Sequence, residues 1–379
     1  MERADVVVIG GGLIGSAIAW RLQQAGRRVI LCERGELGAE ASSAAVGLLL
    51  PEAGREGGPE LWGLWEASLA RYPGFVDEVR EATGVAVEFR QTGNLALAMN
   101  AAEGEVLSRR FRAQVAAKIP AELLSGDGAR AIEPSLSPEV QAALFFPRHA
   151  LVDNQRLSKT VPLAAAKAGV EVRVHEPVLG IVVHSGRVEG VETYRGRIAA
   201  DVVVNAAGSW ASLGVPMHHG EPVAGQAGPN DLPLVRPAKG EVIALWTWPR
   251  PIERLLTVSG ASIVARADGR LIVGGTVIDN SYDKAVTAGG VASLLAAAVQ
   301  ALPRLQNARF VEAWSGLRPR TRDDQPIIGS GEVAGLFWAT GHFKTGILAT
   351  PATADVVTAM IEGKEHLPVG SLSPKRFGL

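Results

Sequence analysis

The amino-acid sequence predicts an α/β domain with a parallel sheet, joined to an α+β domain with a mostly antiparallel sheet. At the N-terminus an apolar strand, a glycine-rich turn and a helix follow one another, which is typical of a parallel sheet. Short apolar strands recur between residues 86 and 317, which favours an antiparallel sheet. With 379 residues, the chain is longer than a single core usually supports, so two connected domains are expected.

The composition excludes several classes of protein. There are 39 acidic and 38 basic residues, a net charge of −1, which argues against a nucleic-acid binder. Glycines interrupt the apolar run from Val6 to Trp20, and no positive segment precedes it, so no membrane span, no export signal and a cytoplasmic location are predicted. The single cysteine, Cys32, rules out a disulfide framework within the chain. The seven histidines lack metal-ligand spacing, so no metal site is expected.

The N-terminal turn carries the first functional signal. Gly10-Gly11-Gly12-Leu13-Ile14-Gly15 spells G-x-G-x-x-G directly after the apolar strand Val6–Ile9. In such a turn Gly10 allows the tight bend and Gly12 lets the backbone approach a pyrophosphate. Gly15 lets the following helix, expected over residues 16–24, pack against the strand. The motif therefore predicts a Rossmann-like dinucleotide site.

The next strand, Val29–Cys32, is followed by Glu33. A carboxylate at this position accepts hydrogen bonds from a ribose 2′-hydroxyl and disfavours a 2′-phosphate. The strand, turn, helix and acid together indicate a dinucleotide but do not separate NAD from FAD.

The segment from Arg34 to Leu49 is rich in small and hydroxyl residues. It resembles the flavin-dependent D-amino-acid oxidase superfamily and, within it, the glycine oxidases of the thiamine-biosynthesis type. The resemblance extends over nearly the whole chain, through Phe89–Leu97, Ala143–Pro147 and Ala200–Trp210. It implies an FAD-binding domain and a glycine/D-amino-acid oxidase architecture. Some relatives tether FAD through a C-terminal-half cysteine, which this chain lacks, so the FAD is expected to be bound non-covalently.

The resemblance also assigns cofactor-binding residues. Glu33 and Arg34 would flank the adenosine, Ala41 and Ser42 would lie at the phosphates, and the segment 342–348 would close over the flavin. His342 is expected to be a structural histidine rather than a base. The full set implied is Gly10, Gly12, Ile14, Gly15, Glu33, Arg34, Ala41, Ser42, Ser43, Val46, Gly47, Leu48, Val178, Ala207, Gly208, Trp210, His342, Phe343, Lys344, Thr345, Gly346, Ile347 and Leu348.

Three residues are predicted to act on the substrate. The segment Gly316–Pro319 resembles the family's G-L-R-P motif, and its Arg318 would hold a substrate carboxylate through a planar, bidentate guanidinium. Lys344 stands where glycine oxidases of this type carry an arginine, and Ser262 stands where they carry a tyrosine. A point charge and a short hydroxyl imply a thinner carboxylate clamp and a wider pocket.

The implied reaction is oxidation of glycine or a small or N-substituted amino acid by hydride transfer to FAD. O2 would be reduced to H2O2, and the imine would be hydrolysed to an oxo acid and an amine. A dehydrogenase of the same fold, passing electrons to a quinone or carrier, is the nearest alternative. A non-catalytic flavin-binding subunit, which the Gly316–Pro319 motif disfavours, and an NAD-linked dehydrogenase are weaker ones. A homo-oligomer is left open.

The domains are expected to be discontinuous. The FAD-binding domain is predicted to take residues 1–85, 150–212 and 318–379, and the substrate domain residues 86–149 and 213–317. A helix is expected from Pro351 to Ile361. The Gly- and Pro-rich stretch 214–233 is expected to be an inserted loop that covers the pocket or an oligomer contact, or is disordered.

Overall fold

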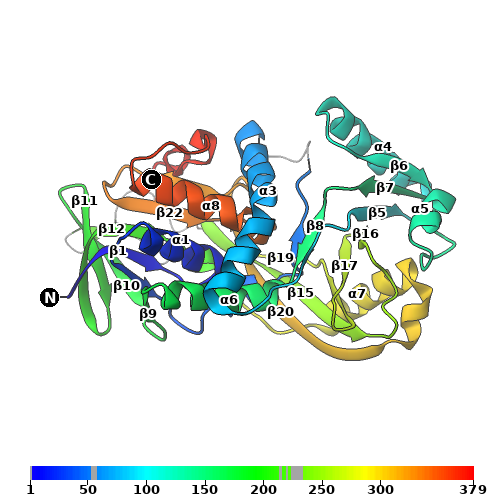
Figure 1. Cartoon of the computed structure of the whole chain (residues 1–379), viewed down its shortest axis with the longest axis horizontal. Helices are drawn as coiled ribbons and strands as arrows, with labels where there is room; N and C mark the ends of the chain where they lie inside the picture. Colours follow the sequence, from blue (N-terminus) through cyan, green and yellow to red (C-terminus); the bar gives the residue numbers. More distant parts are fainter. Residues whose placement is uncertain (1, 53–57, 213–215, 219–220, 223–233) are drawn as a thin grey trace.

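Two large β-sheets organise the chain, and Figure 1 shows them side by side, each with its own helices. The computed structural model describes residues 2–52, 58–212, 216–218, 221–222 and 234–379. A small third sheet joins β3 (Leu48–Leu49), β8 (Ala150–Val152) and β4 (Phe89–Arg90). It lies on the segments that lead from one large sheet to the other.

The first sheet is parallel at its centre, as predicted. The parallel strands follow the order β9 (Glu171–Arg173), β2 (Val29–Cys32), β1 (Glu2–Ile9), β12 (Gly196–Asn205) and β22 (Leu336–Thr340). These strands are mostly buried. Many of their residues are valine or isoleucine, which is typical of parallel strands covered on both faces. The remaining strands of this sheet are β10 (Val178–His184), β11 (Arg187–Thr193), β13 (Pro216–His218), β14 (Glu221–Pro222) and β21 (Ile327–Ser330).

Four helices cover one face of the first sheet and share an apolar core with it. They are α1 (Leu13–Gln24), α3 (Gly58–Thr83), α6 (Asn154–Lys167) and α8 (Gly346–Ile361). The prediction that the last helix begins at Pro351 is wrong, because α8 runs through this proline. Proline has no N–H for the carbonyl four residues earlier, that of Ile347. The buried Tyr72 hydroxyl donates to this carbonyl instead, at 2.5 Å, and so stabilises the longer helix.

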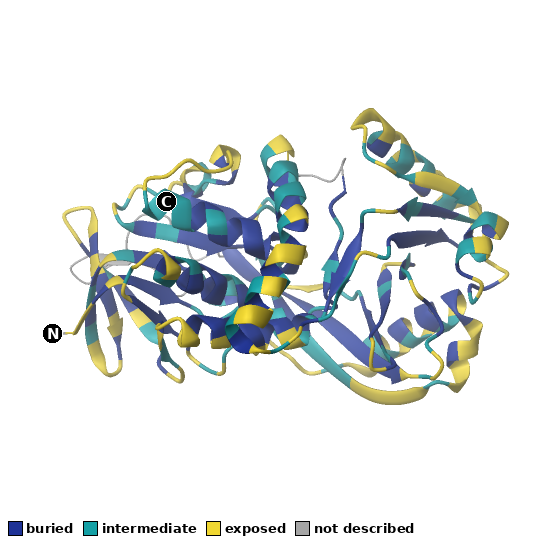
Figure 2. Cartoon of the chain, in the orientation of Figure 1, coloured by how far each residue is buried: buried dark blue, intermediate teal, exposed yellow. Residues whose placement is uncertain are grey.

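The second sheet is antiparallel except for the pair β16–β5, as predicted. It presents one face to α7 (Ala288–Ala301), while α4 (Ala101–Ala116) and α5 (Gly126–Ile132) lie near its far edge (Figure 1). Figure 2 shows its inner strands buried, whereas the start of β20 is exposed. Its strands are β5 (Asn94–Ala98), β6 (Glu122–Ser125), β7 (Ala142–Phe146), β15 (Val235–Trp246), β16 (Leu255–Val258), β17 (Ala261–Ala265), β18 (Arg270–Gly274), β19 (Ile278–Asp279) and β20 (Arg309–Thr321).

The strands β13 and β14 pair with the first sheet, although they lie within the range 213–317 predicted for the substrate domain. The predicted limits of the FAD-binding and substrate domains remain a prediction. Most of the stretch 214–233 lies outside the described residues. Within the described ranges, none of the helices is both long enough and apolar enough to span a membrane.

Candidate functional site

A cavity of about 840 Å³ is lined by residues of both large sheets. Its turn end is lined by the β1–α1 turn, by residues 33–34 and by residues 41–48. Its sheet end is lined by β5, β15–β18, β20 and α4, and the start of α8 contributes as well. Arg318, Lys344 and Ser262 all line this cavity, as does each predicted cofactor-binding residue except Ser43.

The glycines of the turn end have two different roles. A Cβ on Gly15 would collide with the carbonyl oxygen of Gly10, and a Cβ on Gly10 would lie 2.5 Å from the carbonyl oxygen of Ala206. Both glycines are therefore required by the packing of the chain itself. A Cβ on Gly12 would meet only the hydroxyl of Ser42, at 3.4 Å. Within the described part of the chain no backbone atom requires glycine there, so Gly12 leaves room at the N-terminus of α1 for a ligand.

Glu33 is buried, and backbone N–H groups hold its carboxylate in place. Oε2 accepts from the N–H of Gly11 at 2.7 Å, and Oε1 accepts from the N–H of Gly35 at 2.8 Å. Each carboxylate oxygen has a second lone pair, which suits the hydroxyls of a ribose. Beside it, the Arg34 guanidinium lies 3.4 Å from the centroid of the Trp210 ring, a cation–π contact that stiffens this side of the cavity.

The segment 41–48 is fixed by contacts that the sequence did not reveal. Arg266, the residue directly after β17, is buried. It donates to the carbonyls of Val46 at 2.8 Å and Val152 at 2.7 Å. Asn154 donates to the carbonyl of Ser42 at 2.8 Å. Ser43 does not reach the cavity, because its hydroxyl donates to the carbonyl of Glu40. An arginine that follows an apolar strand is the only sequence signal that could have suggested this role for Arg266.

His342 lies just before α8 and is buried. Its Nε2 forms a hydrogen bond of 3.1 Å with the hydroxyl of Thr353. Its Nδ1 is buried without a hydrogen-bond partner in the described part of the chain. Burial lowers the pKa of His342 to about 3, so the ring is neutral at neutral pH. The unpartnered Nδ1, in a side chain that lines the cavity, is suited to hydrogen-bond a ligand there.

Three glycines of the sheet end lie directly against side chains of the protein, which leaves no space for a Cβ. Gly240 and Gly316 are paired across β15 and β20, and Gly274 lies on the neighbouring β18. The guanidinium of Arg318 lies directly over Gly240, where a Cβ would collide with it. Because glycine has no side chain, the guanidinium of Arg318 can occupy the space next to residue 240.

Arg318 is a partly buried cation with one hydrogen-bond acceptor. Its Nη1 donates to the carbonyl of Thr276 at 3.0 Å, and burial lowers the pKa of its guanidinium. Among the described residues no carboxylate pairs with it. A buried charge without a counter-ion is costly, so this arrangement favours an anionic ligand such as a carboxylate.

Lys344 and Ser262 lie on different elements around Arg318. Lys344 is exposed at the cavity rim, and its Nζ lies 5.2 Å from the centroid of the Phe343 ring. The N–H of Phe343 donates to the carbonyl of Pro319 at 2.8 Å, which ties this loop to the residue after Arg318. Ser262, on β17, faces Thr257 across the β16–β17 pair. All three predicted substrate residues thus border one cavity, with Arg318 and Ser262 partly buried and Lys344 exposed.

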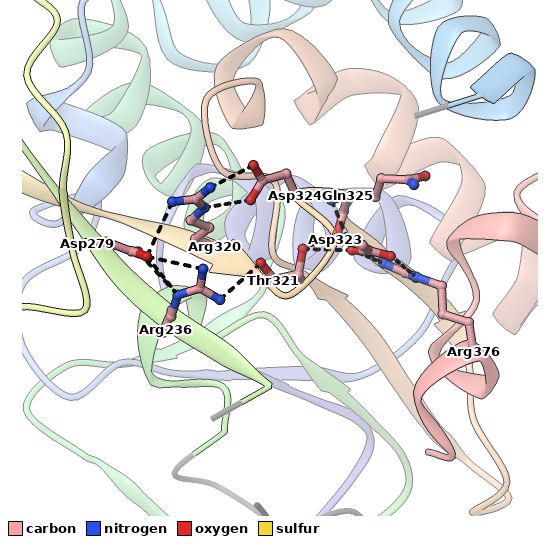
Figure 3. Close-up of polar contacts among 8 residues, drawn as sticks. All are labelled: Arg236, Asp279, Arg320, Thr321, Asp323, Asp324, Gln325 and Arg376. Atoms are coloured by element: carbon pink, nitrogen blue, oxygen red, sulfur yellow. Dashed lines mark hydrogen bonds and ion pairs between the residues drawn. The ribbon is translucent and has the colours of Figure 1, made fainter. Parts of the chain in front are cut away.

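An ion-pair network anchors β20 just beyond Arg318 (Figure 3). Arg320 donates to both oxygens of Asp324, at 2.6 and 2.9 Å, and lies 3.4 Å from Asp279. Arg236, on β15, donates to the same Asp279. Because Asp279 bridges arginines from adjacent strands, the network holds the strand end that carries Arg318.

These features of the cavity together indicate a class of protein. Helix N-termini at Gly12 and Gly346, the buried carboxylate of Glu33 and a guanidinium without an acidic partner among the described residues suit an oxidoreductase that uses a dinucleotide. No cluster of three or more histidine, cysteine or acidic side chains able to hold a metal occurs in the described ranges.

The chain belongs to the FAD dependent oxidoreductase family, whose profile matches residues 5–360. The glycine oxidase of Geobacillus kaustophilus is 34% identical over 373 residues, covering 96% of this chain and 94% of that protein. The crystal structure of the glycine oxidase from the same organism superposes with a TM-score of 0.91, at 32% identity and 98% coverage of both chains. An iminodiacetate oxidase of Chelativorans sp. has a TM-score of 0.84 at 25% identity, covering 97% of this chain and 98% of that one. The cofactor is therefore FAD, and the space at Gly12 and the unpartnered Nδ1 of His342 fit it.

Proposed function

We propose that this protein uses FAD and O2 to oxidise glycine or a small, N-substituted amino acid. The observation that carries the proposal is the guanidinium of Arg318, which lies over Gly240 without an acidic partner in the described chain. It is the group that a carboxylate substrate would neutralise. The related glycine oxidase and iminodiacetate oxidase act on substrates that contain a glycine unit, which supports the same class here.

The residues of the chain would position the reacting bond. Arg318 would grip the carboxylate bidentately and fix the orientation of the α-carbon. The chemistry that FAD supplies when bound is two-electron oxidation of the C–N bond by hydride transfer, with O2 as acceptor and H2O2 as product. His342 is neutral and serves the site by orientation rather than by carrying charge.

FAD would be held without a covalent bond to cysteine. Gly12, Glu33 and the segments 41–48 and 342–348 would bind it. Cys32 is buried in β2, next to Glu33 and so at the ribose position, and burial raises the pKa of its thiol to about 12. A neutral thiol is a poor nucleophile, so acid or heat denaturation should release all the flavin into solution.

An oxygen-electrode assay tests the proposal. Purified protein would be given glycine, sarcosine, other N-alkyl glycines and D-amino acids, and O2 uptake would be compared with H2O2 release. Equal amounts of O2 consumed and H2O2 formed support the oxidase. Substrate-dependent bleaching of the flavin with a quinone but not O2 as acceptor would indicate the dehydrogenase instead. No bleaching with any of these amines would refute amino-acid oxidation.

A further inference from the structure

The sheet end of the cavity contains two buried polar atoms that the proposed reaction does not use. The Oδ1 atom of Asn94 and the Oγ1 atom of Thr257 are both buried, line the cavity and have no hydrogen-bond partner in the described part of the chain. Asn94 as a whole is 1% exposed. An unpaired buried oxygen costs free energy, so two of them in one cavity wall point to a ligand.

The register of the second sheet brings these two atoms onto the same wall. Thr257 pairs with Ala96 across the parallel strands β16 and β5, and Asn94 stands two residues before Ala96. Residues two apart on a strand share a face, so Asn94 and Thr257 project from the same side of the sheet. Ser262 is opposite Thr257 across the β16–β17 pair and also lines the cavity.

Charge indicates which ligand group this wall accepts. The ionisable side chains that line the cavity nearby are two acids, one arginine and one histidine, namely Glu52, Glu103, Arg110 and His149. Arg110 is engaged by Glu52 through bonds of 2.6 and 3.0 Å, and Glu103 accepts from the N–H of Met99 at 2.7 Å. With Arg110 paired to Glu52 and an unpartnered amide oxygen in the cavity wall, a second carboxylate is disfavoured and a hydrogen-bond donor is favoured.

We propose that Asn94 and Thr257 form a second polar subsite, which binds a hydroxyl group on the amine substituent of an N-substituted glycine. The inference rests on the proposed function, since it assumes that Arg318 takes the carboxylate. A hydroxyl can donate to the amide oxygen of Asn94 while it accepts from the hydroxyl of Thr257. This would make the enzyme selective for N-hydroxyalkyl glycines over N-alkyl glycines of the same size.

Unreactive ligands test the subsite separately from turnover. The FAD-loaded protein would be titrated with (2-hydroxyethoxy)acetate, propoxyacetate and oxydiacetate, with changes in flavin absorption as the readout. We expect the hydroxyl ligand to bind at least about tenfold more tightly than its propyl isostere, the scale of one or two satisfied buried hydrogen bonds. Equal affinities, tighter binding of oxydiacetate, or no binding of any of the three would each overturn the subsite.

Two variants test which side chains cause the preference for the hydroxyl ligand. Thr257→Val keeps the shape of the side chain and removes the hydroxyl, and Asn94→Leu removes the amide, so each should bring the affinity ratio towards one. Thr358→Val is the matched control, because the hydroxyl of Thr358 is also buried and unpartnered but lies on α8 outside the cavity lining. A wild-type ratio in both Thr257→Val and Asn94→Leu would contradict the assignment.

Turnover then separates the two proposals. N-(2-hydroxyethyl)glycine should show a kcat/KM at least about tenfold above that of N-propylglycine. If both amines are oxidised equally well, the subsite is wrong while amino-acid oxidation stands. If the ligands show the expected preference but no amine is oxidised, the subsite stands and the proposed function fails.

Discussion

The two ends of the cavity are built in different ways. At the turn end, the lining is largely backbone and small side chains supplied by short, continuous stretches such as residues 10–15 and 41–48. At the sheet end, the lining comes from strands far apart in the chain, and single side chains such as Arg318 provide the chemistry. The first construction suits a cofactor that many proteins share, and the second suits a substrate that must be distinguished from similar molecules.

The difference predicts how each end should fail. At the turn end, a substitution should act through the fold or through FAD affinity, because the backbone makes the site. At the sheet end, a substitution should change substrate handling while the protein remains yellow. The following experiments either sharpen this contrast or break it.

The largest effect is expected within the turn end itself, between two glycines of one motif. Gly15→Ala places a Cβ against the carbonyl oxygen of Gly10, a rigid backbone atom, and should destabilise the apoprotein by at least about 3 kcal/mol. Gly12→Ala meets only the hydroxyl of Ser42, and its backbone φ of −69° suits alanine. It should leave the unfolding midpoint of the apoprotein near that of the wild type and weaken FAD binding by about tenfold or more.

Denaturant unfolding of the apoprotein and titration with FAD would measure the two effects. Normal FAD affinity in Gly12→Ala would show that FAD does not lie close to this glycine. Equal loss of stability in both variants would remove the distinction between packing and ligand-binding glycines.

At the sheet end, Arg318→Ala should have the strongest consequence. The substrate carboxylate would lose its buried cation, so kcat/KM should fall by at least about 100-fold, the scale of a lost charged hydrogen-bond pair. The protein should stay yellow, because Arg318 contacts the carbonyl of Thr276 rather than the turn end. Steady-state kinetics together with the flavin spectrum check both parts, and activity within threefold of the wild type would refute the carboxylate role.

The sequence predicted the turn end well because its signals are local. The strand Val6–Ile9, the glycine motif and Glu33 follow one another within a short stretch, so spacing alone indicated their arrangement. The resemblance to glycine oxidases then located Arg318. Ser43, also implied by the resemblance, does not line the cavity, because adjacent side chains of a short helix point in different directions.

The sheet end could not be predicted in the same way. The contact between Gly240 and Arg318 depends on the pairing of β15 with β20, and the wall formed by Asn94 and Thr257 depends on the pairing of β5 with β16. Such registers follow from the packing of the whole sheet rather than from local patterns. For the same reason, the contact of Arg266 with the carbonyl of Val46 could not be predicted from local patterns.

A milder test of the sheet end is Gly240→Ala. The new Cβ would meet the guanidinium of Arg318, which is the far end of a flexible side chain and can move aside. We expect KM for the amino acid to rise about tenfold while FAD affinity is kept, because the carboxylate clamp is displaced rather than removed. Gly289→Ala is the matched control: Gly289 lies on α7 with open space around it, and its substitution should leave KM unchanged. An unchanged KM in Gly240→Ala would mean that the position of the guanidinium is not critical.

The smallest effect expected concerns His342, which lines the cavity just before α8. Its pKa is lowered to about 3 by burial, whereas an unfolded histidine titrates near 6.5. Between these values the unfolded chain binds the additional proton, so the folded apoprotein loses stability as the pH falls below 6.5. This contribution should amount to about 1 kcal/mol at pH 5.5 relative to pH 7.5.

His342→Gln removes the titrating ring and should therefore lose less stability than the wild type between pH 7.5 and 5.5. Urea unfolding of the apoproteins at both pH values measures the difference, and His366→Gln, an exposed position outside the cavity, is the control expected to behave as the wild type does. If His342→Gln lost as much stability as the wild type, the ring would have to reach water in the apoprotein. The start of α8 would then be open until FAD binds, and the cavity would be assembled by its cofactor rather than presented ready-made.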